Sequence, residues 1–84
     1  MSILRILSHH GDEAYSWNAT LAATGEPEAA AAVREAERIF ADARARGGTA
    51  FRLAPGQPAE RMDSFAPEAE HIVIVPRVSG GNGR

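Results

Sequence analysis

Two short, almost continuous apolar segments, one near each end of the chain, restrict the fold more than any other feature. They cover residues 3–7 (Ile-Leu-Arg-Ile-Leu) and residues 71–75 (His-Ile-Val-Ile-Val). Runs of this length, rich in β-branched residues, are typical of strands that are covered on both faces of a sheet. We therefore expect both to be central strands. If they lie side by side they must run parallel, because no hairpin can join them across the helix predicted between them.

That helix is expected from about residue 26 to residue 46, where alanine is dense and favours helix intrinsically. Thr24 or Gly25 can start it, Pro27 suits its first turn, and Gly47 ends it, since glycine reaches the left-handed conformation without strain. Apolar residues recur at three- and four-residue spacing and predict one buried face. They are Ala29, Val33, Ala36, Phe40 and Ala43.

The remaining segments predict three further strands. Residues 14–17 alternate and follow the turn residues Gly11 and Asp12, which indicates a hairpin with the first strand. Residues 49–53 form a third strand with Phe51 and Leu53 on one side.

A weak fourth strand is expected within residues 60–65, with Phe65 as a core anchor, and residues 18–25 are expected to be a connector. The order of elements predicts an α+β fold in which a mixed sheet of four to five strands packs on one helix.

Length and charge exclude several classes of function. Eighty-four residues suffice for one domain with a thin core. All nine basic residues are arginines, they form no basic stripe, and the net charge is -2. We therefore expect no nucleic-acid partner. No apolar run reaches membrane-spanning length, no signal peptide is recognisable and there is no cysteine, so a cytoplasmic protein without membrane partner is expected.

A glycine pair, Gly80-Gly81, follows the last predicted strand after residues 76–79, which begin with Pro76 and Arg77. Two residues without Cβ form a narrow tail with a wide choice of backbone angles, suited to entering the channel of an enzyme. The element order is that of the β-grasp, and chain and tail together resemble the ubiquitin-like superfamily. The tail is also similar to the Pro-Pro-Val-Ala-Gly-Gly ending of molybdopterin-synthase sulfur carriers. We assign residues 1–78 to a β-grasp domain and residues 79–84 to a flexible tail.

The resemblance implies that the carboxylate of Gly81 is adenylated by an E1-like enzyme and is the site of conjugation. Gly80 would enter the channel of the activating enzyme together with Gly81, while Arg77, Val78 and Ser79 would contact that enzyme. Because only a free carboxylate can be adenylated, the residues after Gly81 would have to be removed by a peptidase. Those residues are Asn82, Gly83 and Arg84.

On this reading the protein is not an enzyme but a ubiquitin-like modifier made as a precursor. Its partners would be an E1-like adenylating enzyme, an E2-like enzyme, a JAMM-type peptidase and the target proteins. Two alternatives remain open. One is a sulfur carrier with a C-terminal thiocarboxylate, and the other is an interaction module whose tail does no chemistry.

Tyr15 and Trp17 lie on one side of the second strand and form a candidate partner patch if they face away from the helix. If they face the helix they are core, and we expect burial of at least one. His9 and His10 make a poor chelate, because adjacent strand residues point to opposite faces. No metal site and no cofactor are expected.

Overall fold

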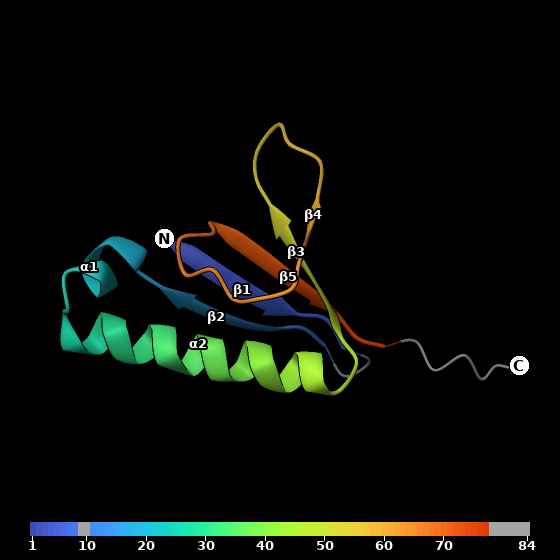
Figure 1. Cartoon of the computed structure of the whole chain (residues 1–84), viewed down its shortest axis with the longest axis horizontal. Helices are drawn as coiled ribbons and strands as arrows, with labels where there is room; N and C mark the ends of the chain where they lie inside the picture. Colours follow the sequence, from blue (N-terminus) through green and yellow to red (C-terminus); the bar gives the residue numbers. More distant parts are fainter. Residues whose placement is uncertain (9–10, 78–84) are drawn as a thin grey trace, which may run out of the picture.

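Seven elements build the protein in the computed structural model, which describes residues 1–8 and 11–77 (Figure 1). In chain order they are β1 (Ser2–Ile6), β2 (Glu13–Trp17), α1 (Ala19–Ala23), α2 (Pro27–Ala45), β3 (Thr49–Leu53), β4 (Glu60–Met62) and β5 (His71–Val75). The strands form one mixed sheet in the order β2-β1-β5-β3-β4. The predicted α+β class and the predicted third and fifth strands are confirmed.

The two apolar segments pair as predicted. β1 and β5 are parallel neighbours, with Leu4 opposite Ile72 and Ile6 opposite Ile74. Backbone hydrogen bonds extend the pairing at both ends, from the Ile3 amide to Glu70 at 3.0 Å and from the Leu7 amide to Ile74 at 3.1 Å. β1 begins and ends one residue earlier than expected.

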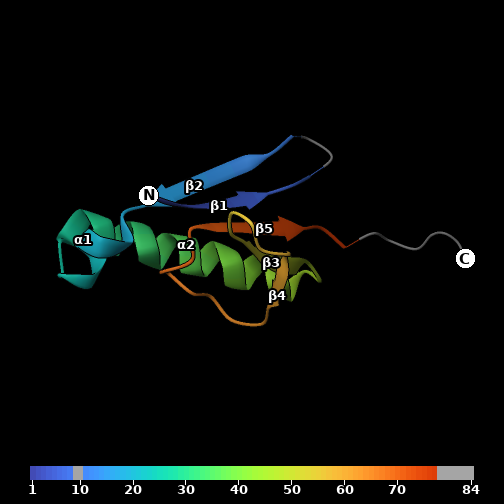
Figure 2. The ribbon, with the colours of Figure 1, turned by 90° about the horizontal axis from the view of Figure 1, so that it is seen from above.

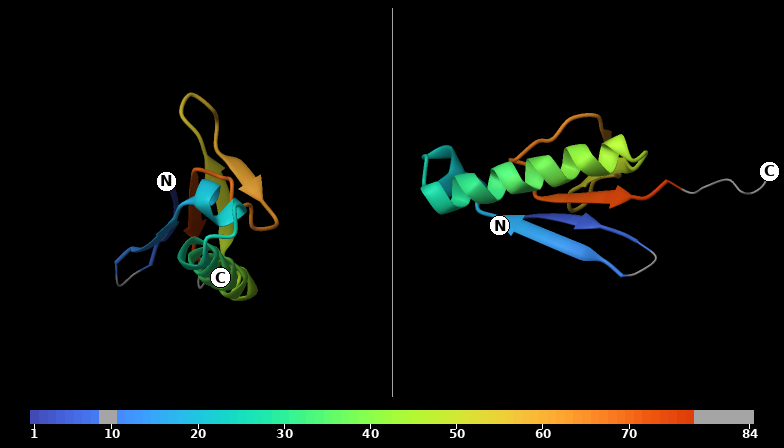
Figure 3. Two further views of the ribbon diagram at one scale, coloured as in Figure 1. Left: turned by 90° about the vertical axis from the view of Figure 1, so that its left-hand side faces the viewer. Right: turned by 90° about the horizontal axis from the view of Figure 1, so that it is seen from below.

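The opening hairpin is also confirmed. β2 pairs antiparallel with β1, so that Leu4 lies opposite Tyr15 and Ser2 opposite Trp17. Gly11 adopts a φ of 114° in the connection, a conformation that favours glycine. Figures 2 and 3 show that the turn end of this hairpin extends away from α2.

The long helix has the predicted extent but a different start. Its N-cap is Glu26, whose carboxylate accepts a hydrogen bond from the Ala29 amide at 2.7 Å, instead of Thr24 or Gly25. Pro27 occupies the first turn, as expected. The helix ends at Ala45, and Gly47 follows with a φ of 94°. On the exposed side Arg46 pairs with Asp42 at 3.0 Å.

The segment predicted as a connector contains the short helix α1, so that prediction was wrong. Asn18 caps this helix by accepting a hydrogen bond from the Leu21 amide at 3.0 Å. An asparagine before an alanine-rich stretch is a helix start signal, since its side chain satisfies an amide that has no partner within the helix. α1 packs against α2 and closes one end of the molecule (Figure 1).

The weak fourth strand is shorter than expected, ending at Met62 rather than near Phe65. Phe65 instead lies in the loop after β4, half-buried against the core. Its ring centroid is 5.4 Å from that of Trp17 and 5.6 Å from that of Phe40. The predicted role of Phe65 as a core anchor is confirmed.

The core lies between α2 and one face of the sheet. From the central strands it takes Leu4, Ala50, Ile72 and Ile74, and from the helix Ala36 and Phe40. Trp17, Met62 and Ala69 complete it. Val33 and Ala43, which were predicted on the buried helix face, are half-buried beside it.

The two central strands are covered on one face only, contrary to the expectation of cover on both. α2 lies along one side of the sheet, and none of the described residues forms a helix on the other side (Figure 2). With one long helix for five strands, the described chain has no second layer to supply. Half of each continuous apolar strand therefore faces outward.

Candidate functional site

The tail root, Val75 to Arg77, leaves the sheet at the end of its central strand. The aliphatic stem of Arg77 packs on the backbone of Gly47, just after α2 ends. A Cβ atom placed on Gly47 would lie 2.9 Å from Arg77 Cδ, closer than such carbons approach. Glycine at this position therefore allows the root of the tail to lie against the end of the helix.

The other residues proposed for the tail chemistry lie outside the described residues. These are Val78, Ser79, Gly80, Gly81, Asn82, Gly83 and Arg84. The boundary predicted at residue 78 falls among them, as does the conjugation site. His9 and His10, dismissed above as metal ligands, also lie outside the described residues.

The sheet face opposite α2, which we call the outer face, presents apolar side chains near the tail root. The register places Val73 between Arg5 and Phe51, and His71 between Ile3 and Leu53. All these side chains are half-buried, and Val75 beside them is 36% exposed. Apolar residues in adjacent positions on an uncovered sheet are typical of an interaction surface.

Two arginines also belong to the outer face. Arg5 lies 3.8 Å from Asp12, a long ion pair between side chains about half exposed, and exposed pairs of this kind stabilise little. Arg61 lies opposite Phe51 on the edge strand β4 and is exposed. Apolar and aromatic side chains together with arginines have the composition that protein interfaces favour.

His71 carries an unpartnered polar atom on this face. Its Nε2 is buried and has no hydrogen-bond partner. Burying a polar atom without a partner costs free energy that an apolar side chain would not. This atom therefore lowers the contribution of His71 to the stability of the fold.

The candidate patch of Tyr15 and Trp17 is divided between core and groove. Both side chains point to the helix side of the sheet. Trp17 is 2% exposed, and its Nε1–H donates to the Pro67 carbonyl at 2.9 Å, so it belongs to the core. The expectation that at least one of the two is buried is confirmed. Trp17 therefore cannot belong to an exposed partner patch.

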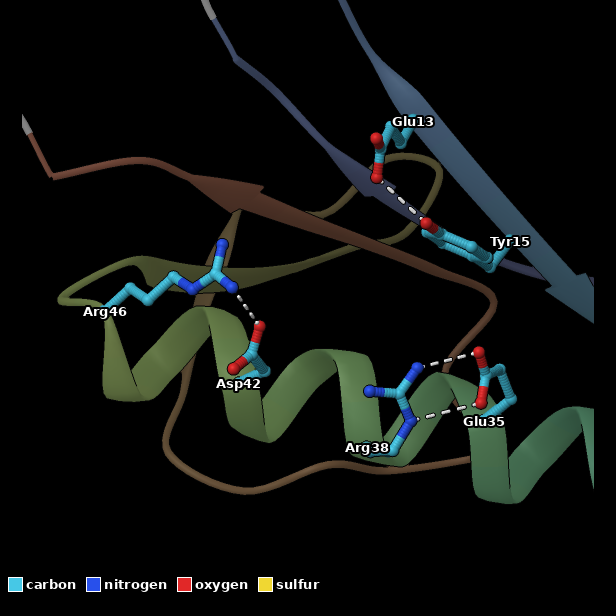
Figure 4. Close-up of polar contacts among 6 residues, drawn as sticks. All are labelled: Glu13, Tyr15, Glu35, Arg38, Asp42 and Arg46. Carbon is cyan, nitrogen blue, oxygen red and sulfur yellow. Dashed lines mark hydrogen bonds and ion pairs between the residues drawn. The ribbon is translucent and has the colours of Figure 1, made fainter.

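Tyr15 is half-buried beside a groove between β2 and α2. Its hydroxyl donates to Glu13 Oε1 at 2.8 Å (Figure 4). This hydrogen bond is the main cause that raises the pKa of Tyr15, with burial and the charge of Glu13 adding to it.

The sequence reasoning missed both the outer face and this groove. The signal for the outer face was present: two continuous apolar strands and only one long helix to cover them. The groove depends on how far the β1–β2 hairpin diverges from α2, which no local pattern encodes.

Comparison with protein-family models, with curated proteins and with solved structures gives no match. The resemblance described above therefore stays a prediction. Within residues 1–8 and 11–77, no group of acidic, histidine or cysteine side chains is arranged to hold a metal ion. No helix in the same residues is long and apolar enough to cross a membrane.

Proposed function

We propose that the protein is a ubiquitin-like modifier of β-grasp fold, activated at the carboxylate of Gly81 by an E1-like enzyme. The carboxylate would attack the α-phosphate of ATP and release pyrophosphate. A thiol of the E1-like or E2-like enzyme would then displace AMP from the acyl group. An amine of a target protein would finally take the acyl group from that thiol.

One observation carries the proposal: the strand that enters the Gly80-Gly81 tail is the central strand of the sheet, paired in parallel with β1. A mixed five-stranded sheet with one long helix is compatible with a β-grasp. Anchoring on a central strand gives the tail a rigid base from which an enzyme can draw it into a channel.

Processing is a necessary step in this proposal. Asn82 follows Gly81, so the carboxyl group of Gly81 is tied up in a peptide bond until that bond is hydrolysed. A JAMM-type peptidase is the proposed enzyme. The expected result is that it releases the residues after Gly81 and stops there, which intact-mass measurement reads directly.

The decisive test of the function mixes the chain ending at Gly81 with a candidate E1-like enzyme and ATP. An acyl-adenylate, detected by mass spectrometry, is the expected product. The full chain serves as the matched control and should give no adenylate at Gly81. Loss of the signal in Gly81→Pro would show that activation depends on this residue. Absence of any adenylate would refute the proposal, and a thiocarboxylate without protein conjugates would identify a sulfur carrier.

A second candidate is an interaction module without tail chemistry, and the outer face favours it. Its apolar centre, with Val73 and Phe51, could dock a partner whether or not Gly81 is activated. Phe51→Glu separates the two functions, because it should abolish partner binding at the outer face. If the tail does no chemistry, a variant that lacks residues 78–84 should bind the partner as well as the full chain does.

A further inference from the structure

Met62 carries one of the two sulfur atoms of the chain, since the other methionine is Met1 and the sequence contains no cysteine. The Met62 side chain is 7% exposed and belongs to the core. In the sheet Met62 lies opposite Ala50, which lies opposite Ile74, so it ends the row of side chains that face α2. The outermost strand of the sheet therefore holds a buried thioether, a group that oxidants convert to a polar sulfoxide.

The strand that contains Met62 has little support from its neighbours. β4 has three residues, fewer than any other strand, and among the strands of the described chain it pairs with β3 alone. Glu60 and Arg61 are exposed, so Met62 is the one side chain of β4 that reaches the core. This side chain is therefore the main apolar anchor of the strand.

The chain on either side of β4 adds few stabilising contacts. Residues 54–59 before it are all exposed, and Figure 1 shows their loop projecting from the rest of the molecule. After it, Asp63 lies 3.8 Å from Arg44, and the side chain of Asp63 is 86% exposed. An exposed ion pair of this length stabilises little. The next side chain that packs against the core is Phe65.

Residues 54–64, which we call the β4 segment, can therefore open while the rest of the sheet stays closed. At one boundary Leu53 pairs with β5, and at the other the ring of Phe65 packs against two further aromatic rings. Segments with few buried apolar contacts open at the lowest cost in free energy. Opening exposes the sulfur of Met62 to solvent, while β3 keeps all its pairs with β5.

We propose that Met62 is a peroxide-sensitive site and that its oxidation releases the β4 segment from the sheet. The sulfur lone pair attacks one oxygen of hydrogen peroxide and forms the S–O bond, while the O–O bond breaks. The second oxygen leaves as hydroxide and takes the proton of the transferred oxygen, which gives water. The sulfur loses two electrons and the peroxide gains them. The inference does not depend on the chemistry of Gly81.

The new oxygen changes the balance between the closed and the open β4 segment. In the closed form the oxygen lies beside Ala50 and Ile74, whose side chains offer no hydrogen-bond donor. A buried acceptor without a partner costs free energy, whereas water satisfies it in the open form. Oxidation therefore favours opening, which leaves β3 as the edge of a four-stranded sheet. Methionine sulfoxide reductases would reverse the change.

The first measurement is the rate of oxidation in the full chain, treated with hydrogen peroxide at neutral pH. Peptide mass spectrometry follows the oxygen that each methionine gains. Met1 is 83% exposed and serves as the internal reference. Met62 should oxidise at least about tenfold more slowly than Met1, because it reacts only while the β4 segment is open. In urea the two rates should become equal.

The second measurement is hydrogen exchange of the oxidised protein, labelled with ¹⁵N and observed by NMR. The amides of β4, and those of β3 that face it, should exchange at least about tenfold faster than in the untreated protein. The amides that join β1 to β5 should stay as slow as before. Reductases for both sulfoxide epimers should restore slow exchange in β4.

Two variants make the result specific. Met62→Leu keeps an apolar side chain of similar volume but has no sulfur to oxidise. Peroxide should therefore leave the exchange of its β4 amides unchanged. Met62→Gln places a polar group of similar length at the same position without any oxidant. Its β4 amides should exchange fast before peroxide is added, while the pairing of β1 with β5 stays protected.

Four outcomes would overturn the proposal. The first is loss of protection between β1 and β5 together with β4, since oxidation would then unfold the whole domain. The second is unchanged exchange of β4 in protein fully oxidised at Met62. The third is equal oxidation of Met62 and Met1 in the native protein. The fourth is complete resistance of Met62 until the whole protein unfolds, which would exclude separate opening of the β4 segment.

Discussion

At the scale of single residues, Tyr15 is the most informative reporter of the groove. It is the only tyrosine in the chain, so the ultraviolet absorbance of tyrosinate follows this one hydroxyl. The hydrogen bond to Glu13 stabilises the protonated phenol and raises its pKa from the ordinary value. Removing the carboxylate should therefore make Tyr15 ionise at lower pH.

We expect Glu13→Gln to lower the midpoint of this titration relative to the wild type. The pKa of Tyr15 is higher in the folded than in the unfolded protein. The stability that its hydrogen bond to Glu13 contributes is therefore complete below the unfolded pKa, near 10. It is lost as pH rises through the folded pKa, and Glu13→Gln should reduce this alkaline loss. Asp12→Asn, in the same hairpin, is the control. An unchanged midpoint in Glu13→Gln would contradict the hydrogen bond.

At the scale of elements, the junction between α2 and the tail root depends on Gly47. Its backbone φ of 94° is one that residues with a side chain rarely adopt, and its backbone contacts the aliphatic stem of Arg77. Gly47→Ala should lower the free energy of unfolding by about 1–3 kcal/mol through backbone strain and this contact. Urea denaturation measures the loss.

Gly56→Ala is the matched control for this junction. Gly56 also has a positive φ, 72°, but a Cβ atom there would meet nothing within 4 Å. Its substitution should cost only the conformational part, about 1 kcal/mol. Adding Arg77→Gly to Gly47→Ala should recover the difference between the two variants. If both glycine variants are equally destabilised, the contact with Arg77 is unimportant.

Most elements were predictable from the sequence because each has a strong local signal. The parallel pairing of β1 with β5 followed from two apolar segments and the helix between them. Helix α1 was missed because its five residues are too few to show a helical pattern of apolar residues, although Asn18 is a good N-cap. Cover on both sheet faces was wrongly expected because a local pattern cannot reveal how many layers the chain supplies.

The candidate site was less predictable than the fold. Gly80 and Gly81 are adjacent in the sequence and can be recognised there, but the outer face and the groove combine residues far apart in the chain. His71 meets Ile3 and Leu53 only through strand pairing, and Tyr15 lies near Glu35 only through the packing of α2. Such proximity depends on tertiary structure.

At the scale of the whole molecule, the absence of lysine restricts the conjugates that the proposed function allows. All nine basic residues are arginines, whose guanidinium groups stay protonated and are poor nucleophiles. Purified conjugates, digested and sequenced as branched peptides, should therefore carry no isopeptide branch on an internal residue of this protein. A branch at any internal position would contradict this prediction.

The parallel pairing of β1 with β5 also determines how the fold responds to mechanical force. Residue 1 lies at the start of one strand and residue 77 beyond the end of its neighbour, at opposite ends of the sheet (Figure 1). Tension between them acts along the strands and loads the bonds of this ladder in shear, all at once. A hairpin pulled from its open end instead loses its bonds one at a time. A machine that unfolds the protein by pulling on its tail would therefore meet its strongest resistance at the first step.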